Sequence, residues 1–236
     1  MAERVQKLIA QAGLASRRQA EAWISAGKVL INGRPAQLGD RADLSSDRVE
    51  VNGQLLSAAE KKLVVLLNKP RGYVSTMKDP QGRRLVTDLV ADISQRLYPV
   101  GRLDYNTEGL LLLTNDGDLA LQLSHPRHHV EKTYLVKARG LLSEKIKVQL
   151  EKGIELEDGP TRPARVAKVR NSAAGSWFEL TIAEGRNRQV RRMCEAVGLS
   201  VVRLKRIGIA FLELGNLPTG HYRLLTDEEI NRLKSH

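Results

Sequence analysis

The sequence has a single cysteine, Cys194, among its 236 residues. One cysteine excludes a disulfide within the chain and a zinc site built on several thiolates. The five histidines include the neighbours His128 and His129, but no His-Glu-x-x-His spacing is present. No nucleotide or flavin motif is visible either. We therefore expect neither a metal nor a cofactor.

Long apolar segments are also missing, since no run approaches the length of a membrane helix. The first 14 residues carry Glu3, Arg4 and Lys7 within their apolar pattern, which is unlike a signal peptide. We expect a cytoplasmic protein without membrane association. Aromatic residues make up only 4% of the chain. A core must therefore be built from leucine, valine, isoleucine and alanine.

Acidic residues are in deficit, and the formal net charge is +11. Such an excess favours a polyanionic partner, which could be RNA, DNA or an anionic membrane surface. A merely solubilising surface charge is the plainer alternative. No helix-turn-helix or zinc pattern supports binding to DNA.

The first 57 residues read as a small unit of two helices and short strands. Segment 5–12 has apolar residues at helical spacing, and Ser16 to Gln19 has the pattern of a capping box that opens a second helix. Asn32-Gly33 and Asn52-Gly53 each predict a type I′ hairpin turn. Basic residues are concentrated here, which predicts phosphate contacts, although a solvated basic face is the alternative. They are Arg4, Lys7, Arg17, Arg18, Lys28 and Arg34.

A polar linker at residues 58–62 separates this unit from a second domain, 63–236. The apolar run 63–67 predicts a strand that is buried on both faces. Mixed strands and interspersed helices indicate an α+β fold. Strands are expected at 110–113, 131–138, 177–182 and 201–207, and helices within 85–97, from a cap at Asp118 to before Pro126, at 143–150 and at 226–234.

Gly101 to Leu110 is the stretch in which we expect the chemistry. If the chain is extended there, Arg102 and Asp104 point to the same side, because side chains alternate along a strand. A carboxylate beside an arginine could bind or attack a substrate. An ordinary ion pair that stabilises a turn is the alternative.

A second informative stretch runs from Glu184 to Gly198. Arg188, Arg191 and Arg192 fall at i, i+3 and i+4, on one face of a predicted helix. Such an array repels itself unless it faces several negative charges, such as a nucleic-acid backbone and a carboxylate. A solvated helix face is the alternative. Cys194 lies on the apolar face and is predicted to be a core residue.

Two family resemblances rest on these residues. Residues 8–33 resemble the RNA-binding domain named after small-subunit ribosomal protein S-four. The motifs Gly101-Arg102-Leu103-Asp104-x-x-Thr107-x-Gly109-Leu110, Lys132-Thr133-Tyr134 and Glu184 to Met193, together with Asn68-Lys69-Pro70-x-Gly72, resemble the RsuA/RluB family of rRNA pseudouridine synthases, and its RluB, or large-subunit, branch in particular.

The resemblance implies a mixed, mainly antiparallel sheet with flanking helices, and isomerisation of uridine to pseudouridine in large-subunit rRNA. It assigns catalysis to Asp104, places Arg191 against that carboxylate to keep it ionised and oriented, and matches Tyr134 to the residue that stacks on the flipped base, with Leu204 as the apolar floor. We expect a monomer whose partner is ribosomal RNA, either large-subunit rRNA or an assembly intermediate. Candidate RNA contacts are Lys7, Ser16, Arg17, Arg18, Lys28, Asn32, Arg102, Lys132, Arg188 and Arg192.

Two alternatives remain open. The same chemistry on small-subunit rRNA would change only the branch. A ribosome assembly factor that binds rRNA without catalysis would keep the fold, but it would be expected to have lost Asp104, Tyr134 or Arg191, and all three are present.

Overall fold

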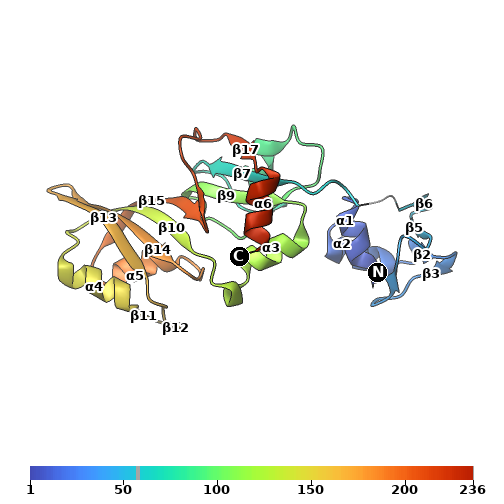
Figure 1. Ribbon diagram of the computed structural model, residues 1–236, viewed down its shortest axis with the longest axis horizontal. Coiled ribbons are helices and arrows are strands. Elements are labelled where there is room, and N and C mark those ends of the chain that lie inside the picture. Colours follow the sequence, from blue (N-terminus) through green and yellow to red (C-terminus); the bar gives the residue numbers. More distant parts are fainter. Residues whose placement is uncertain (57–58, 236) are drawn as a thin grey trace. The chain divides into compact units, whose positions relative to one another are not determined.

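A mixed sheet dominates the larger of two units into which the chain divides (Figure 1). The computed structural model describes residues 1–56 and 59–235, so the expected domain boundary at Ser57 and Ala58 lies outside the described residues. One unit comprises Met1–Leu63 with the short segments Ile93–Arg96 and Asn115–Gly117, and the other comprises the rest of the described chain.

The smaller unit contains the two expected helices and both expected hairpins. Ser16 Oγ accepts a hydrogen bond from the Gln19 backbone N–H at 3.2 Å and so caps the second helix. In each hairpin, asparagine and glycine both have positive φ, as a type I′ turn requires. Its elements are β1 (Glu3–Arg4), α1 (Val5–Gln11), α2 (Arg17–Ser25), β2 (Val29–Ile31), β3 (Arg34–Pro35), β4 (Arg41–Ala42), β5 (Val49–Val51) and β6 (Gln54–Leu55).

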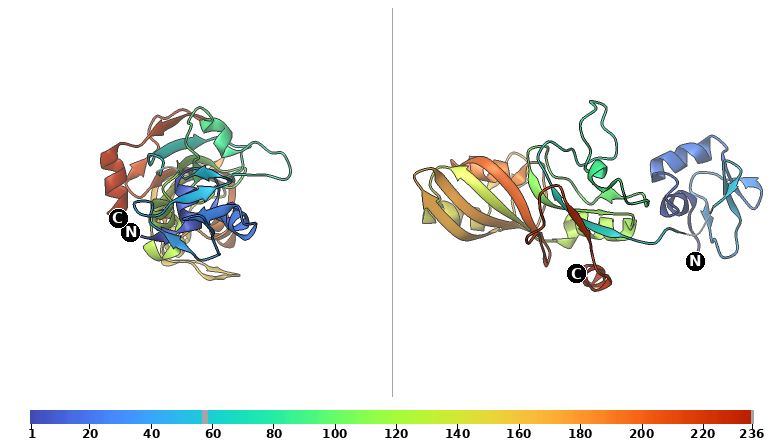
Figure 2. Two further views of the ribbon diagram at one scale, coloured as in Figure 1. Left: turned by 90° about the vertical axis from the view of Figure 1, so that its right-hand side faces the viewer. Right: turned by 90° about the horizontal axis from the view of Figure 1, so that it is seen from above.

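The larger unit is built on a sheet with the strand order β13-β14-β10-β15-β9-β7-β17. Its strands twist and curve around one another when seen from above (Figure 2). The strands of this sheet are β7 (Val64–Lys69), β8 (Tyr98–Pro99), β9 (Glu108–Thr114), β10 (Lys132–Arg139), β13 (Arg165–Ser172), β14 (Gly175–Ile182), β15 (Ser200–Ile209), β16 (Leu212–Glu213) and β17 (Tyr222–Leu224). A separate hairpin is formed by β11 (Glu155–Leu156) and β12 (Gly159–Pro160).

The helices of this unit are short. The 3-10 helices are η1 (Val86–Val90) and η2 (Pro126–His128), and the α-helices are α3 (Gly117–Ser124), α4 (Glu144–Lys152), α5 (Gln189–Ala196) and α6 (Asp227–Lys234). The α+β prediction is confirmed. Among the described residues, no helix has the length and apolar character needed to cross a membrane.

Burial explains the strands that the sequence predicts best. Every residue of β7 and β9 is buried, because these strands lie in the middle of the sheet and are covered on both faces. On one face their leucines pack with α3 and α6. β9 is joined antiparallel to β7 and parallel to β15. The parallel pairing brings the ends of two distant chain segments together.

Two predictions about helices, one on a cap and one on a shared face, were wrong in detail. Asp118 does not cap α3, because that helix already begins at Gly117 and Asp118 lies in its first turn. Arg188 does not share a helix face with Arg191 and Arg192, because it precedes α5 as the N-cap residue in a left-handed conformation, with φ of 48°. The array of three arginines is therefore broken.

Candidate active site

The turn that carries Asp104 is held from beneath by a buried lysine. Lys69, at the end of β7, is fully buried, and its ammonium donates hydrogen bonds to three backbone carbonyls. These are the carbonyls of Pro70 at 3.0 Å, Asp104 at 3.1 Å and Thr107 at 2.9 Å. A lysine ammonium has three donors, so all of them are used, and two of them fix the backbone of this turn.

Burial lowers the pKa of Lys69 to about 8, although the nearby carboxylates of Asp104 and Glu108 act in the opposite direction. A second bond pair fixes the same turn, since Ser75 Oγ accepts from the Leu103 N–H at 3.2 Å and donates to the Leu103 carbonyl at 3.0 Å. The Asp104 backbone is thus fixed on both sides of its own residue.

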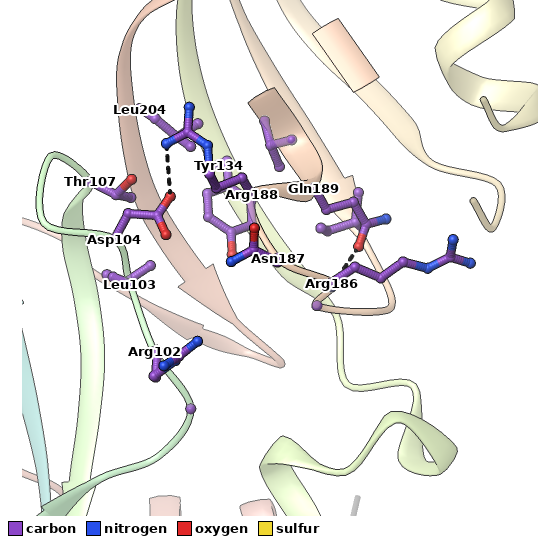
Figure 3. A pocket seen from close by; sticks show the side chains of 14 residues that line it. Arg102, Leu103, Asp104, Thr107, Tyr134, Arg186, Asn187, Arg188, Gln189 and Leu204 are labelled. Carbon is purple, nitrogen blue, oxygen red and sulfur yellow. Dashed lines mark hydrogen bonds and ion pairs between the residues drawn. The ribbon is translucent and has the colours of Figure 1, made fainter. Parts of the chain in front are cut away.

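A cavity of about 290 Å³ opens over this turn (Figure 3). The Asp104 side chain lies on one wall, while Tyr134 from β10 and Leu204 from β15 contribute the aromatic and apolar surface. Cavity residues also come from the segment before α5. The full lining is Gly101, Arg102, Leu103, Asp104, Thr107, Tyr134, Ile182, Gly185, Arg186, Asn187, Arg188, Gln189, Val190 and Leu204.

The structure places Tyr134 and Leu204 through sheet register. Tyr134 pairs with Arg206 of β15 and with Leu180 of β14. Directly paired residues of neighbouring strands face the same side of a sheet, so Arg206 lies on the side of Tyr134. Residues two apart on a strand also face the same side, so Leu204 lies on that side as well. The structure therefore brings Tyr134, Leu204 and Asp104 together at one cavity.

Asp104 forms its ion pair with Arg188, and not with Arg191 as the sequence predicted. Arg188 Nη1 lies 4.0 Å from Asp104 Oδ2, with both side chains partly exposed to solvent. Coulomb attraction at this separation is weak in water, about 1 kcal/mol. The pair therefore orients the two groups more than it stabilises the fold. The left-handed backbone at Arg188 turns this side chain into the cavity.

Arg191 is buried in α5 and is not among the residues that line the cavity. Its Nη1 donates to the Val201 carbonyl at 3.3 Å. Burial, followed by the neighbouring Arg188, lowers its pKa, and Asp104 acts in the opposite direction. Arg191 thus contributes positive charge close to Asp104, while its hydrogen bond joins α5 to β15.

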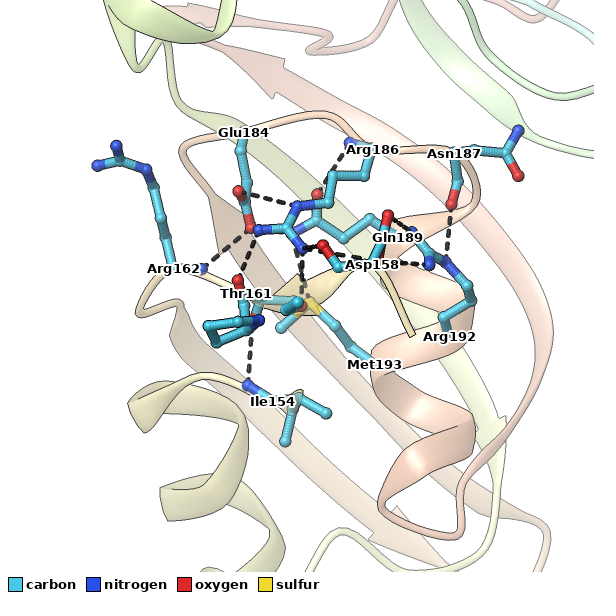
Figure 4. Close-up of polar contacts among 12 residues, drawn as sticks. Ile154, Asp158, Thr161, Arg162, Glu184, Arg186, Asn187, Gln189, Arg192 and Met193 are labelled. Carbon is cyan, nitrogen blue, oxygen red and sulfur yellow. Dashed lines mark hydrogen bonds and ion pairs between the residues drawn. The ribbon is translucent and has the colours of Figure 1, made fainter. Parts of the chain in front are cut away.

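Arg192 is committed to a protein partner (Figure 4). Its two terminal nitrogens bind the Asp158 carboxylate at 2.8 and 3.0 Å, and its Nε donates to the Asn187 carbonyl at 2.9 Å. Arg186 donates to the backbone of the same β11–β12 hairpin. These arginines hold that hairpin beside α5. The sequence had assigned Arg192 to RNA, and it missed this structural role.

The other predicted RNA contacts divide into engaged and exposed groups. Lys132 donates to the Val130 carbonyl at 2.8 Å, and burial, followed by Arg206, lowers its pKa to about 8. Lys7 is paired with Glu3, and Asn32 holds the hairpin through Asp47 and Arg48. The exposed members, whose charges face solvent, are Arg17, Arg18, Lys28 and Arg102.

Sequence reasoning missed several buried groups behind the cavity. Glu108 accepts from Arg203 at 2.8 Å and so joins β9 to β15. Arg206 is buried and donates to the Leu110 carbonyl at 2.7 Å. The one available signal was Lys69, a charged residue two positions after the apolar run of β7. Within residues 1–56 and 59–235, no three histidine, cysteine or acidic side chains gather as metal ligands.

Comparisons with known proteins agree with this arrangement. Residues 63–196 match the RNA pseudouridylate synthase family, and residues 3–49 match the S4 domain. The chain is 49% identical over 236 residues to ribosomal large subunit pseudouridine synthase B of Bacillus subtilis, covering 99% of this chain and 96% of that protein. It is 42% identical to an uncharacterized RNA pseudouridine synthase of Aquifex aeolicus, covering 99% and 94%.

A solved structure is similar over nearly its whole length as well. The crystal structure of a pseudouridylate synthase matches with a TM-score of 0.69 and 34% identity, covering 98% of this chain and 99% of that one. The family expected from the motifs is thus confirmed by its model, by near full-length relatives and by the fold. The chain belongs to the RNA pseudouridylate synthase family and carries an S4 domain ahead of the synthase domain.

Proposed function

We propose that this protein isomerises a specific uridine of large-subunit rRNA to pseudouridine, with Asp104 as the catalytic group. The observation that carries the assignment of Asp104 is that it is the one carboxylate among the described residues that line the cavity. The large-subunit substrate is supported by near full-length similarity to a relative that is named for the large ribosomal subunit.

The reaction moves one bond and leaves the composition of the nucleoside unchanged. The bond from uracil N1 to ribose C1′ breaks, the base turns, and a bond forms from C5 to C1′. A proton leaves C5 and N1 gains one. Neither oxidation nor reduction occurs. A carboxylate serves this sequence as a nucleophile or as a base at the sugar, and both roles need the anion close to the ribose.

To reach Asp104 in the cavity, the target uridine must leave its stacked position in the RNA. Flipping costs a few kcal/mol, and it costs least where the RNA is already distorted. The cavity offers Tyr134 as a stacking surface and Leu204 as an apolar wall. Arg188 lies 4.0 Å from the Asp104 carboxylate and helps to orient it. Arg102, exposed on the rim, is placed to contact the neighbouring phosphate or the vacated stack.

Binding energy comes from phosphates. Exposed basic side chains of the S4 domain, Arg17, Arg18 and Lys28, supply sequence-independent attraction to RNA. We place the protein in the cytoplasm, where its rRNA substrate is made, and we propose that it acts as a monomer.

Pseudouridine mapping tests this proposal. We expect cells that lack the protein to lose one large-subunit mark, which wild type and the exposed control Asp227→Asn restore and Asp104→Asn does not. In single-turnover assays, Asp104→Asn should be slower by about 10³-fold or more. An unchanged large-subunit map would contradict the proposal, and a lost small-subunit mark would redirect the substrate. Restoration by Asp104→Asn would favour the non-catalytic assembly factor.

A further inference from the structure

Thr107 has a buried hydroxyl that no protein group uses. The residue ends the turn that carries Asp104 and lines the same cavity, and only 2% of its surface is exposed. Its backbone is engaged, because its N–H donates to the Asp104 carbonyl at 3.0 Å and its carbonyl accepts from Lys69 at 2.9 Å. Within the described chain, the side-chain hydroxyl has no hydrogen-bond partner.

Other buried hydroxyls in this unit are satisfied by the protein. Thr161 Oγ1 accepts from the Ile154 N–H at 2.8 Å, and the buried Thr181 hydroxyl pairs at 3.0 Å with that of Thr133, which is partly buried. Native folds satisfy nearly all buried polar groups, because an unmade hydrogen bond is unfavourable. Valine has the same shape and avoids this penalty. Thr107 therefore keeps a polar atom where the fold alone gains nothing from it.

The place of the hydroxyl indicates what it binds. Figure 3 shows Thr107 beside Asp104, on the wall that faces Tyr134. The phosphates of a bound RNA would contact the arginines on the rim of the cavity. The polar atoms that reach as deep as Thr107 would therefore belong to the base or the ribose of the flipped nucleotide. A hydroxyl can donate to a uracil carbonyl, and it can also donate to or accept from a ribose hydroxyl.

We propose that Thr107 Oγ1 hydrogen-bonds a polar atom of the target uridine when the flipped nucleotide fills the cavity, and so positions it against Asp104. This inference rests on the proposed function. Because Lys69 binds both the Asp104 and the Thr107 carbonyl, the backbone positions that carry the carboxylate and the hydroxyl are held at a fixed spacing. One rigid turn thereby supplies both the reactive group and a reference contact for the substrate.

The test compares Thr107→Val, which removes the hydroxyl, with Thr107→Ser, which retains it. The substrate is unmodified large-subunit rRNA transcribed in vitro. We expect Thr107→Val to lower kcat/KM by about 10- to 100-fold, since a site built around a hydrogen bond loses it completely. Its melting temperature should stay at or above that of wild type. Thr107→Ser should remain within about threefold of wild type.

Thr181→Val serves as the matched control, because it removes a hydroxyl that has a protein partner outside the cavity. It should lower the melting temperature and leave kcat/KM unchanged. A short RNA spanning the mapped site, with 2′-deoxyuridine at the target, identifies the bonded atom. If wild type and Thr107→Val have the same kcat/KM on this RNA, the hydroxyl binds the ribose 2′-hydroxyl. If Thr107→Val remains slower, the hydroxyl binds the base.

Equal kcat/KM for Thr107→Val and wild type would overturn the inference and leave the proposed function standing. A loss in Thr107→Ser as large as that in Thr107→Val would also overturn it, because shape and not the hydroxyl would then matter. If wild type itself forms no pseudouridine in the transcript, the proposed function and this inference both fall.

Discussion

The protonation state of the Lys69 side chain affects the backbone of the turn that carries Asp104. Its three hydrogen bonds need the ammonium, because a neutral amine has only two donors. Since its pKa is about 8, the proton is lost in the mildly alkaline range. In the unfolded chain the lysine keeps its proton up to a pKa of about 10.5, so the free energy of unfolding rises as pH increases from about 8 to about 10.5. The same loss of the proton frees one of the three carbonyls that the ammonium binds in the folded protein.

We predict that the single-turnover rate falls as pH rises through about 8, while the protein remains folded. Rates between pH 6.5 and 9.5, recorded beside circular dichroism spectra, check this. Lys132→Met is the control, because burial also lowers the pKa of Lys132 to about 8. The decline should persist in that variant. Its disappearance there would assign the titration to Lys132.

Arg188 and Arg191 should respond differently to substitution. Arg188→Asn removes the guanidinium but suits the left-handed backbone, which asparagine tolerates. We expect about a tenfold loss in single-turnover rate and an unchanged melting temperature, because the ion pair orients Asp104 and adds little stability. Arg191→Gln should lower the melting temperature, since it removes a buried link to β15. If Arg191→Gln lowered the rate and Arg188→Asn lowered the melting temperature instead, Arg191 would be the partner of Asp104, as the sequence predicted.

Close contact of β9 with β15 depends on a glycine. Gly109 has φ of +102°, and a Cβ there would lie 2.1 Å from the Arg206 carbonyl oxygen. Gly109→Ala should therefore destabilise the fold by about 3 kcal/mol, from backbone strain and the clash together. Gly82→Ala is the control, because Gly82 also has positive φ but open space around it, and it should cost about 1 kcal/mol. Chemical denaturation measures the free energy of unfolding of both variants. Equal decreases would show that backbone strain, and not the clash with Arg206, accounts for the effect.

The same elements explain what the sequence could predict. Buried strands such as β7 and β9 were visible as continuous apolar runs, and Asp104 and Tyr134 lie in short local motifs. β13 was missed, because it is an edge strand with mostly exposed polar residues and has no alternation to read. The roles of Lys69 and Arg206 depend on partners 38 and 96 residues away, which no local pattern reveals.

The whole molecule, with its net charge of +11, should bind RNA with strong salt dependence. Replacing Arg17 and Arg18 with glutamine should reduce the slope of log affinity against log salt by about 1.5, or about 0.7 to 0.9 for each lost phosphate contact. Replacing the exposed Lys145 and Lys152 of α4 with glutamine makes the same charge change and should alter the slope much less. If both double variants change the salt slope equally in binding titrations, RNA is attracted by the overall positive charge and not by contacts at Arg17 and Arg18.

The parallel pairing of β9 with β15 also determines the stage of translation at which the active fold can form. Asp104 leaves the ribosome early, but Leu204 and the strand that seats beside β9 follow about 100 residues later, which takes about 5 to 20 s at ordinary rates of synthesis. Until then β9 has an unsatisfied edge and the turn of Asp104 lacks its opposite wall. The nascent chain is therefore inactive for most of its translation, and its activity begins only when the last third has been made.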